Sequence, residues 1–291
     1  MKNFIIESAI PAFRNFLVTD KIALAIIEQD DSLTWDSLML DSSFKQKKIL
    51  TVPSNKFEFE DCMSIVHYLS PASTVAGLNL CRMASDECRK ACLGFTGNLN
   101  FHVNASYRNK TIALVKFTRR YIEALVSEMV RYTMIAISQG KKPYFRLNGL
   151  SDIPFYRVID FVALDAWIKE TAEALGVDIL GPTFYDYSKY PINQSIDGVY
   201  HVTYSYNENT RADWLTRFDR VAFVLPKKDH KKLLSLYPDR FIDGNQSDIR
   251  PLDSVKYVLL PLKGKNRGET GFVLNGDTVL NIVDIEGVNH V

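Results

Sequence analysis

The stretch around which the chain is organised is LNLCRMASDECRKACLGFTG, residues 78–97. It holds Cys81, Cys88 and Cys92, three of the four cysteines in the sequence, separated by six and then three residues. Thiolates are soft ligands that favour iron–sulfur clusters, zinc or copper(I). The spacing therefore predicts that the three thiolates converge on one ion or one cluster and leave a coordination position open.

Two other interpretations of the cysteines stay open on the sequence alone. Cysteine is among the most buried residue types, and Cys88 and Cys92 are four residues apart, as on one face of a helix. The cysteines could therefore be core residues, or could include a redox-active thiol pair. The isolated Cys62 fits the core better than a metal site, although it could supply a fourth thiolate. His102 could serve as the fourth ligand of a zinc ion.

The overall composition is that of an ordinary globular protein. The chain has 291 residues, of which 46% are hydrophobic and 24% charged, with a formal net charge of +1. This charge gives no overall signature of nucleic-acid binding, which remains conceivable through local basic patches such as residues 227–232. Clustered cysteines in a chain this long indicate a reducing compartment. Since no apolar run reaches about 18 residues and no signal peptide is recognised, we expect a cytoplasmic protein without a membrane segment.

Apolar runs alternate with helical patterns along the chain, which predicts βαβ units and a parallel sheet. Such units can form an open doubly wound sheet or a partly closed barrel. The Asn-Gly pair at residues 275–276 predicts a hairpin over residues 272–280. The longest helical pattern covers residues 103–138. The predicted strands cover residues 74–80, 143–147, 183–187, 200–204, 221–225, 241–244 and 257–260.

Polar residues gather directly after the apolar strands. Parallel α/β proteins bind ligands at the carboxyl ends of their strands, so these residues are candidates for one shared site. The competing interpretation is that some of them cap the following helices or form weak ion pairs, such as Asp186 with Lys189 or Asp248 with Arg250. The residues are Asn148, Ser151, Asp152, Asp186, Lys189, Ser205, Glu208, Asp243, Asp248 and Arg250.

Five ordered motifs resemble those of the phage gene product 88 family. The resemblance extends from about residue 75 to residue 267. The motifs are the cysteine motif at residues 81–97, Arg-Leu-Asn-Gly-Leu-Ser-Asp-Ile-Pro at 146–154, Phe-Tyr-Asp-Tyr-Ser-Lys at 184–189, residues 200–208, and residues 243–250 with 262–265.

The layout of this family looks like that of radical S-adenosylmethionine enzymes. The resemblance implies a partial (βα)6 TIM-like barrel over residues 71–291, with the cysteine loop and the hairpin, and an N-terminal extension over residues 1–70. It implies a phage-encoded protein of the host cytoplasm that binds a [4Fe–4S] cluster, S-adenosylmethionine and an unknown substrate. Radical enzymes of this type usually show C-x3-C-x2-C, whereas this chain has C-x6-C-x3-C.

The resemblance also assigns roles to the candidate residues. Cys81, Cys88 and Cys92 are the expected cluster ligands. The alternative function is a zinc-stabilised phage protein that binds nucleic acid or another partner without catalysis, for which the same thiolates would hold zinc. The expected catalytic residues are Asp152, Asp186, Lys189 and Glu208, and the expected cofactor-binding residues are Asn148, Ser151, Ser205, Asp243, Asp248 and Arg250.

Overall fold

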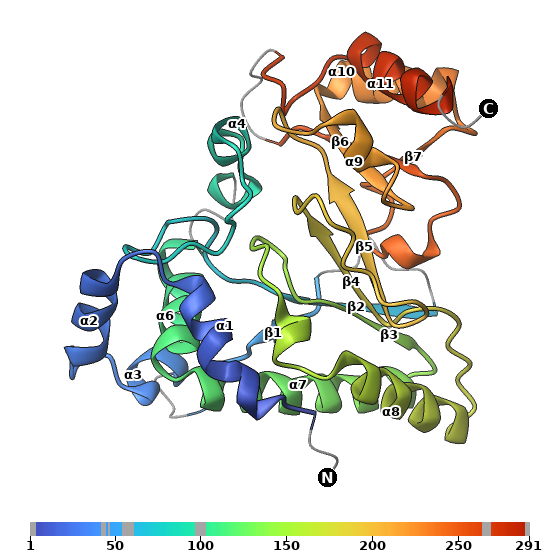
Figure 1. The fold of residues 1–291 in the computed structure, drawn as a ribbon. Helices are drawn as coiled ribbons and strands as arrows, with labels where there is room; N and C mark the ends of the chain where they lie inside the picture. The colour runs from blue at the N-terminus through green and yellow to red at the C-terminus, as the bar shows by residue number, and fades with distance from the viewer. Residues whose placement is uncertain are drawn as a thin grey trace.

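The centre of the protein is one open β-sheet (Figure 1). The structure is a computed structural model that describes residues 4–41, 45, 47–53, 61–96, 103–263 and 269–288. Within these residues the sheet has eight strands in the order β1-β2-β3-β4-β5-β6-β8-β7. The strands are β1 (Leu50–Thr51), β2 (Cys62–His67), β3 (Lys142–Arg146), β4 (Phe184–Ser188), β5 (Tyr200–Ser205), β6 (Val221–Leu225), β7 (Phe241–Asp243) and β8 (Tyr257–Pro261).

The strands from β2 to β6 neighbour one another in chain order, and all of them are parallel. β8 and β7 continue the parallel sheet, while β1 pairs with β2 in the antiparallel direction. The carboxyl ends of the parallel strands consequently lie along one edge. The sheet does not close, so the fold is mixed α/β with an open sheet, and the expected partial TIM-like barrel is not confirmed.

Two pairs of helices pack together at different ends of the sheet. Figure 1 shows α7 and α8 side by side along β2 and β3, and α10 with α11 beyond β6, while α4 lies apart from both pairs. In the part of the chain that the structure describes, no helix combines the length and apolar character needed to cross a membrane. The helical segments are η1 (Glu7–Ala9), α1 (Ile10–Leu17), α2 (Lys21–Gln29), α3 (Trp35–Met39), α4 (Asp86–Lys90), η2 (Leu93–Phe95), η3 (Val103–Tyr107), α6 (Arg108–Lys116), α7 (Thr118–Ser138), η4 (Phe155–Arg157), α8 (Phe161–Ala174), α9 (Ala212–Leu215), α10 (Lys227–Leu236), η5 (Arg250–Leu252) and α11 (Gly276–Val288).

The long helical pattern at residues 103–138 forms three consecutive segments, η3, α6 and α7. In α7, buried side chains recur every three or four residues, as at Tyr121, Leu125 and Met129, and this stripe faces the sheet. The helix ends where Gly140 adopts a left-handed conformation with φ of 70°. Its amide donates to the carbonyl of Ile137 at 2.9 Å, which satisfies one of the last helical carbonyls.

The predicted strand at residues 74–80 is wrong, because these residues form a loop that packs against the N-terminal helices. The amide of Thr19 donates to the carbonyl of Gly77 at 2.8 Å, and the amide of Asn79 donates to the carbonyl of Leu17 at 3.0 Å. The apolar character of the loop thus reflects burial under this segment. The first parallel strand is instead β2, all six residues of which are buried.

The predicted hairpin at residues 272–280 is also wrong, because α11 begins at Gly276. The side chain of Asn275 accepts a hydrogen bond from the amide of Thr278 at 2.8 Å. Asn275 therefore acts as a helix N-cap rather than as the first of the two central residues of a type I′ turn. Val273 does reach the sheet, where it forms a parallel bridge with Val224.

We predict that Gly77→Ala destabilises the protein more than Gly140→Ala does. Gly77 has φ of 75° and Gly140 has φ of 70°, which is the left-handed region, so alanine costs about 1–2 kcal/mol at either position. A Cβ at residue 140 meets nothing within 4 Å, whereas at residue 77 it would lie 2.4 Å from the Cβ of Ala23. This overlap adds about 1–3 kcal/mol. Chemical denaturation of both variants measures the difference in the free energy of unfolding. Equal losses of stability would contradict the packing of the 74–80 loop on α2.

Candidate functional site

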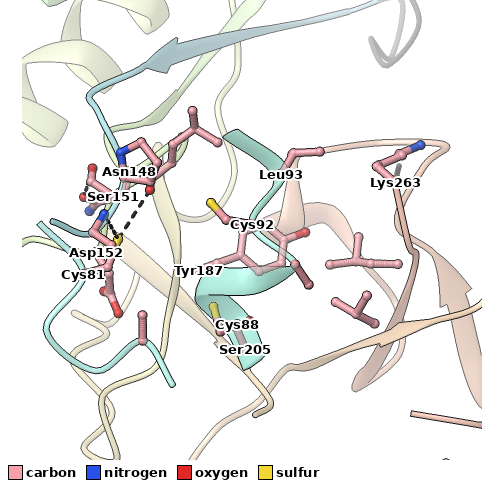
Figure 2. A pocket seen from close by; sticks show the side chains of 18 of the residues that line it. Cys81, Cys88, Cys92, Leu93, Asn148, Ser151, Asp152, Tyr187, Ser205 and Lys263 are labelled. Atoms are coloured by element: carbon pink, nitrogen blue, oxygen red, sulfur yellow. Dashed lines mark hydrogen bonds between the residues drawn. The ribbon is translucent and has the colours of Figure 1, made fainter. Parts of the chain in front are cut away.

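A pocket of about 600 Å³ lies at the carboxyl ends of the parallel strands, where the cysteine segment covers them. Figure 2 shows part of its lining, in which the three thiols lie with Asn148 and Asp152 from a separate segment. The topology therefore brings together most of the residues that the sequence singles out. The candidate residues that line the pocket are Cys81, Cys88, Cys92, Asn148, Ser151, Asp152, Lys189, Ser205 and Asp248.

The three cysteines reach the pocket from different local structures. Cys81 directly follows the loop at residues 74–80, Cys88 lies in the short helix α4, and Cys92 precedes the 3-10 turn η2. The thiol of Cys81 donates to the carbonyl of Leu150 at 3.4 Å, and its sulfur accepts from the amide of Ala72 at the same distance. Ala72 has φ of 44°, a strained conformation for a residue with a side chain. The loop thus aims a backbone amide at a sulfur atom.

The thiols are near one another without forming a ready site for a single ion. Among the described residues, no group of three or more His, Cys, Asp and Glu side chains could hold one metal ion. One zinc ion requires its thiolates about 2.3 Å from the metal. His102, the suggested fourth zinc ligand, lies outside the described residues.

Burial strongly disfavours the charged form of two of the thiols. It raises the pKa of Cys81 to about 12 and also raises the pKa of Cys92. A thiol with a raised pKa is a weak nucleophile, which argues against a reactive redox pair unless a cation stabilises the thiolate. Cys62 is buried in a separate cluster with Tyr144, Tyr185 and Ile249, as expected for a core cysteine.

Lys189 supplies a positive charge beside the thiols. Burial alone would lower its pKa, but the charges of Cys88, Asp152, Cys81 and Cys92 together raise it above its ordinary value. Its ammonium group donates to the hydroxyl of Ser205 at 2.9 Å. Its backbone amide donates to Asp152 at 2.9 Å, which links β4 to the loop after β3. An ammonium group in this position can stabilise thiolates or a negatively charged group held by them.

Asp186 lies behind the pocket rather than in its lining. Its carboxylate accepts from the amide and the side chain of Asn148 at 2.7 and 2.9 Å, and from the hydroxyl of Tyr200 at 3.2 Å. Asn148 in turn accepts from the hydroxyl of Ser151 at 2.9 Å. Burial, which outweighs these hydrogen bonds, raises the pKa of Asp186 to about 7. Asp186 therefore holds the loop after β3 in place.

Glu208 also lies outside the pocket lining, where it fixes the N-terminus of α4. Its carboxylate accepts from the hydroxyl of Ser85 at 2.6 Å and from the amide of Glu87 at 2.9 Å. Ser85 itself caps the helix by accepting from the amide of Cys88 at 3.2 Å. Since α4 carries a cysteine, Glu208 positions one of the thiols from the loop after β5.

Asp243 and Arg250 support the structure behind the pocket. Asp243 pairs with the ring of His230 at 3.1 Å and accepts from the amide of Asn245 at 2.8 Å. Arg250 is fully buried and pairs with Asp253 at 2.9 Å, whereas the competing interpretation suggests a pair of Arg250 with Asp248. The alternative pair of Asp186 with Lys189 is likewise absent from the contacts described for these two residues.

Asp248 pairs instead with Arg146, the first residue of the motif at 146–154, which lines the pocket and finds in Asp248 the counter-charge that a strand-end arginine needs. Tyr187 lines the pocket as well (Figure 2). The two-residue period of a strand offers a signal for Tyr187, because Tyr187 lies in β4 two residues before Lys189, which directly follows the strand. Nothing local predicts the Arg146–Asp248 pair, whose members are 102 residues apart.

Comparison with known proteins gives a family but no relative of established activity. The family model described as gene product 88 matches residues 41–276. The chain belongs to the gene product 88 family. No curated protein and no solved structure matches it significantly. The match begins before β1 and ends at the start of α11, so it includes every strand of the sheet.

We predict that Asp186→Asn flattens the pH dependence of stability. The folded carboxyl titrates at about 7 and the unfolded one near 3.8, so the folded state keeps a proton that the unfolded state releases. The free energy of unfolding of the wild type therefore falls as the pH rises from about 4 to about 7. Urea denaturation across this range measures the effect. Asp197→Asn, at an exposed position, controls for the loss of one acidic side chain, and an unchanged slope in Asp186→Asn would contradict the assignment.

We predict that Glu208→Ala loosens α4 without unfolding the sheet. A five-residue helix has little stability of its own, and the variant loses two hydrogen bonds to its first turn. Amide hydrogen exchange in residues 85–92 should accelerate about tenfold or more, which corresponds to about 1.4 kcal/mol. Glu208→Gln should show a smaller change because its amide oxygen still accepts one bond. Exchange in α7 is the internal control, and unchanged protection of residues 85–92 would refute the role.

Proposed function

We propose that this gene product 88 protein is an iron–sulfur enzyme of the radical S-adenosylmethionine type, in which Cys81, Cys88 and Cys92 hold a [4Fe–4S] cluster. The observation that carries the proposal is that three thiols from one short segment line one pocket at the carboxyl ends of parallel strands. The sequential order of β2 to β6 is compatible with a partial (βα)6 barrel, which we propose as the finer description of the sheet.

The surroundings of the thiols support a cluster more than a zinc ion. Three thiolates leave one corner of a four-iron cluster free for a small molecule. When bound, the cluster and S-adenosylmethionine would supply one-electron chemistry that removes a hydrogen atom from a substrate. Lys189 contributes a positive charge close to the thiols, and Asp152 and Ser205 offer oxygen acceptors beside it. The protein's part is to bind, orient and enclose the reactants.

The pocket walls suit such enclosure. Apolar side chains such as Leu260 and Phe272 form much of the lining, and Leu93 and Phe95 contribute from the turn after Cys92. An apolar lining excludes water and limits side reactions of a reactive species. We assign Asp152, Lys189 and Ser205 to direct contact with the cofactor or substrate, whereas Asp186 and Glu208 act by positioning the loops that carry the site.

The test is elemental analysis and absorption spectroscopy of protein purified without oxygen. We expect about four irons and four sulfides per chain and a broad visible absorption band. Cys88→Ala should lose the colour and most of the iron. Cys62→Ala, which removes the one cysteine that is buried outside the pocket, should keep both.

Two outcomes would overturn this function. Iron retained in Cys88→Ala would exclude the three-cysteine site. One zinc and no iron per chain would instead favour the zinc-stabilised binding protein, which further predicts salt-sensitive binding to nucleic acid.

A further inference from the structure

Besides Lys189, which lies beside the thiols, the pocket contains a second cation that the proposed function leaves without a role. Arg146, at the end of β3, and Asp248, on the loop after β7, form an ion pair in the pocket lining. Their side chains are 16% and 26% exposed. The other arginine–aspartate pair nearby, Arg250 with Asp253, is 0% and 1% exposed and does not line the pocket. Arg146 and Asp248 are thus open to a ligand, while the buried pair is a structural element.

Arg146 is held firmly but keeps unused hydrogen-bond donors. A single nitrogen, Nη1, donates to both carboxylate oxygens of Asp248, at 2.8 and 2.9 Å. Its Nη2 makes only a long contact of 3.4 Å with the carbonyl of Gly149, and its buried Nε has no partner among the described residues. The guanidinium group lies over the ring of Tyr187 at 4.7 Å, which fixes its plane. A guanidinium with free donors and a fixed plane is suited to carboxylate or phosphate oxygens.

The surroundings of Arg146 differ from those of Lys189. Arg146 has Tyr68, Tyr185 and Tyr187 as its neighbours besides Asp248, whereas Lys189 faces Asp152 and the three thiols. The hydroxyl of Tyr187 is buried and, within the described part of the chain, has no hydrogen-bond partner. The two cations therefore serve two different groups, and aromatic and apolar side chains line the pocket around them.

We propose that Arg146 binds a carboxylate or phosphate group of a substrate whose remaining body is apolar or aromatic. Because this substrate is the one on which the cluster would act, the proposal rests on the proposed function. Asp248 keeps Arg146 oriented before the substrate binds but repels the incoming anion. Tyr68 and Tyr187 offer ring surfaces for the body of the substrate, as do the apolar residues of the wall.

Because Asp248 is negatively charged, the proposal predicts the direction in which its replacement changes the affinity for an anion. If the pair were only structural, removing either member would weaken any ligand binding by disturbing the wall. If Arg146 binds an anion, Asp248→Asn removes a competing negative charge and should strengthen anion binding. Arg146→Gln should weaken anion binding at least tenfold, and Arg146→Lys should keep more of it because the positive charge remains.

The experiment is calorimetric titration of the metal-free protein with phenyl phosphate and with 3-phenylpropionate, and with benzyl alcohol as a neutral control. We expect at least one of the two anions to bind and benzyl alcohol not to bind. Arg146→Gln should lower the affinity for the anion at least tenfold, and Asp248→Asn should raise it several-fold. Arg217→Gln, which removes an arginine from an exposed ion pair with Asp213, is the matched control and should not change binding.

Each outcome decides for or against the subsite. Binding of phenyl phosphate alone identifies a phosphate, and binding of 3-phenylpropionate alone identifies a carboxylate. Failure of both anions to bind, equal binding by Arg146→Gln, or weaker binding by Asp248→Asn overturns the proposal. If Arg146→Gln does not fold, the sign of the change in Asp248→Asn decides alone.

The same titration separates this proposal from the proposed function. Anion binding by a protein that takes up no iron would leave the subsite intact and remove the radical enzyme. Four irons per chain without any anion binding would support the radical enzyme and overturn the anion subsite.

Discussion

The rest of the structure depends on one constraint, which is that the strands from β2 to β6 are neighbours in chain order and pair in parallel. It places the carboxyl ends of five strands along one edge, so the loops that follow them share one region of space. The cysteine segment, the Asn148 loop and Lys189 come from distant parts of the chain and meet only for this reason. The chemistry of the pocket is therefore a consequence of topology before it is a consequence of any local motif.

Apolar runs predicted most of the parallel strands because each run fits between buried neighbours. β3, β4, β5, β6 and β8 are all found within about a residue or two of their predicted positions. The two failures have different causes, because a distant part of the chain decides the first conformation and a local helix cap decides the second. Residues 74–80 are apolar because they pack under the N-terminal helices. The Asn-Gly pair is followed by a helix because Asn275 caps it.

The candidate site shows the same division between what is local and what is not. Clustered thiols and strand-end polar residues are visible in the sequence, and most of them do line the pocket. The sequence cannot tell a lining residue from one a layer behind it, as Asp186 and Glu208 show, because that depends on which loop fills the space. The pairing of Arg146 with Asp248 across 102 residues is likewise beyond any local pattern.

The anchoring of α4 by Glu208 has a consequence for the order of events during folding. The helix has five residues, too few to pay for its own nucleation, and its anchor lies 121 residues beyond Glu87. The segment that carries Cys88 can therefore acquire its final conformation only after β5 has joined the sheet. The thiol of Cys88 therefore reaches its final position late, on a scaffold that is already formed.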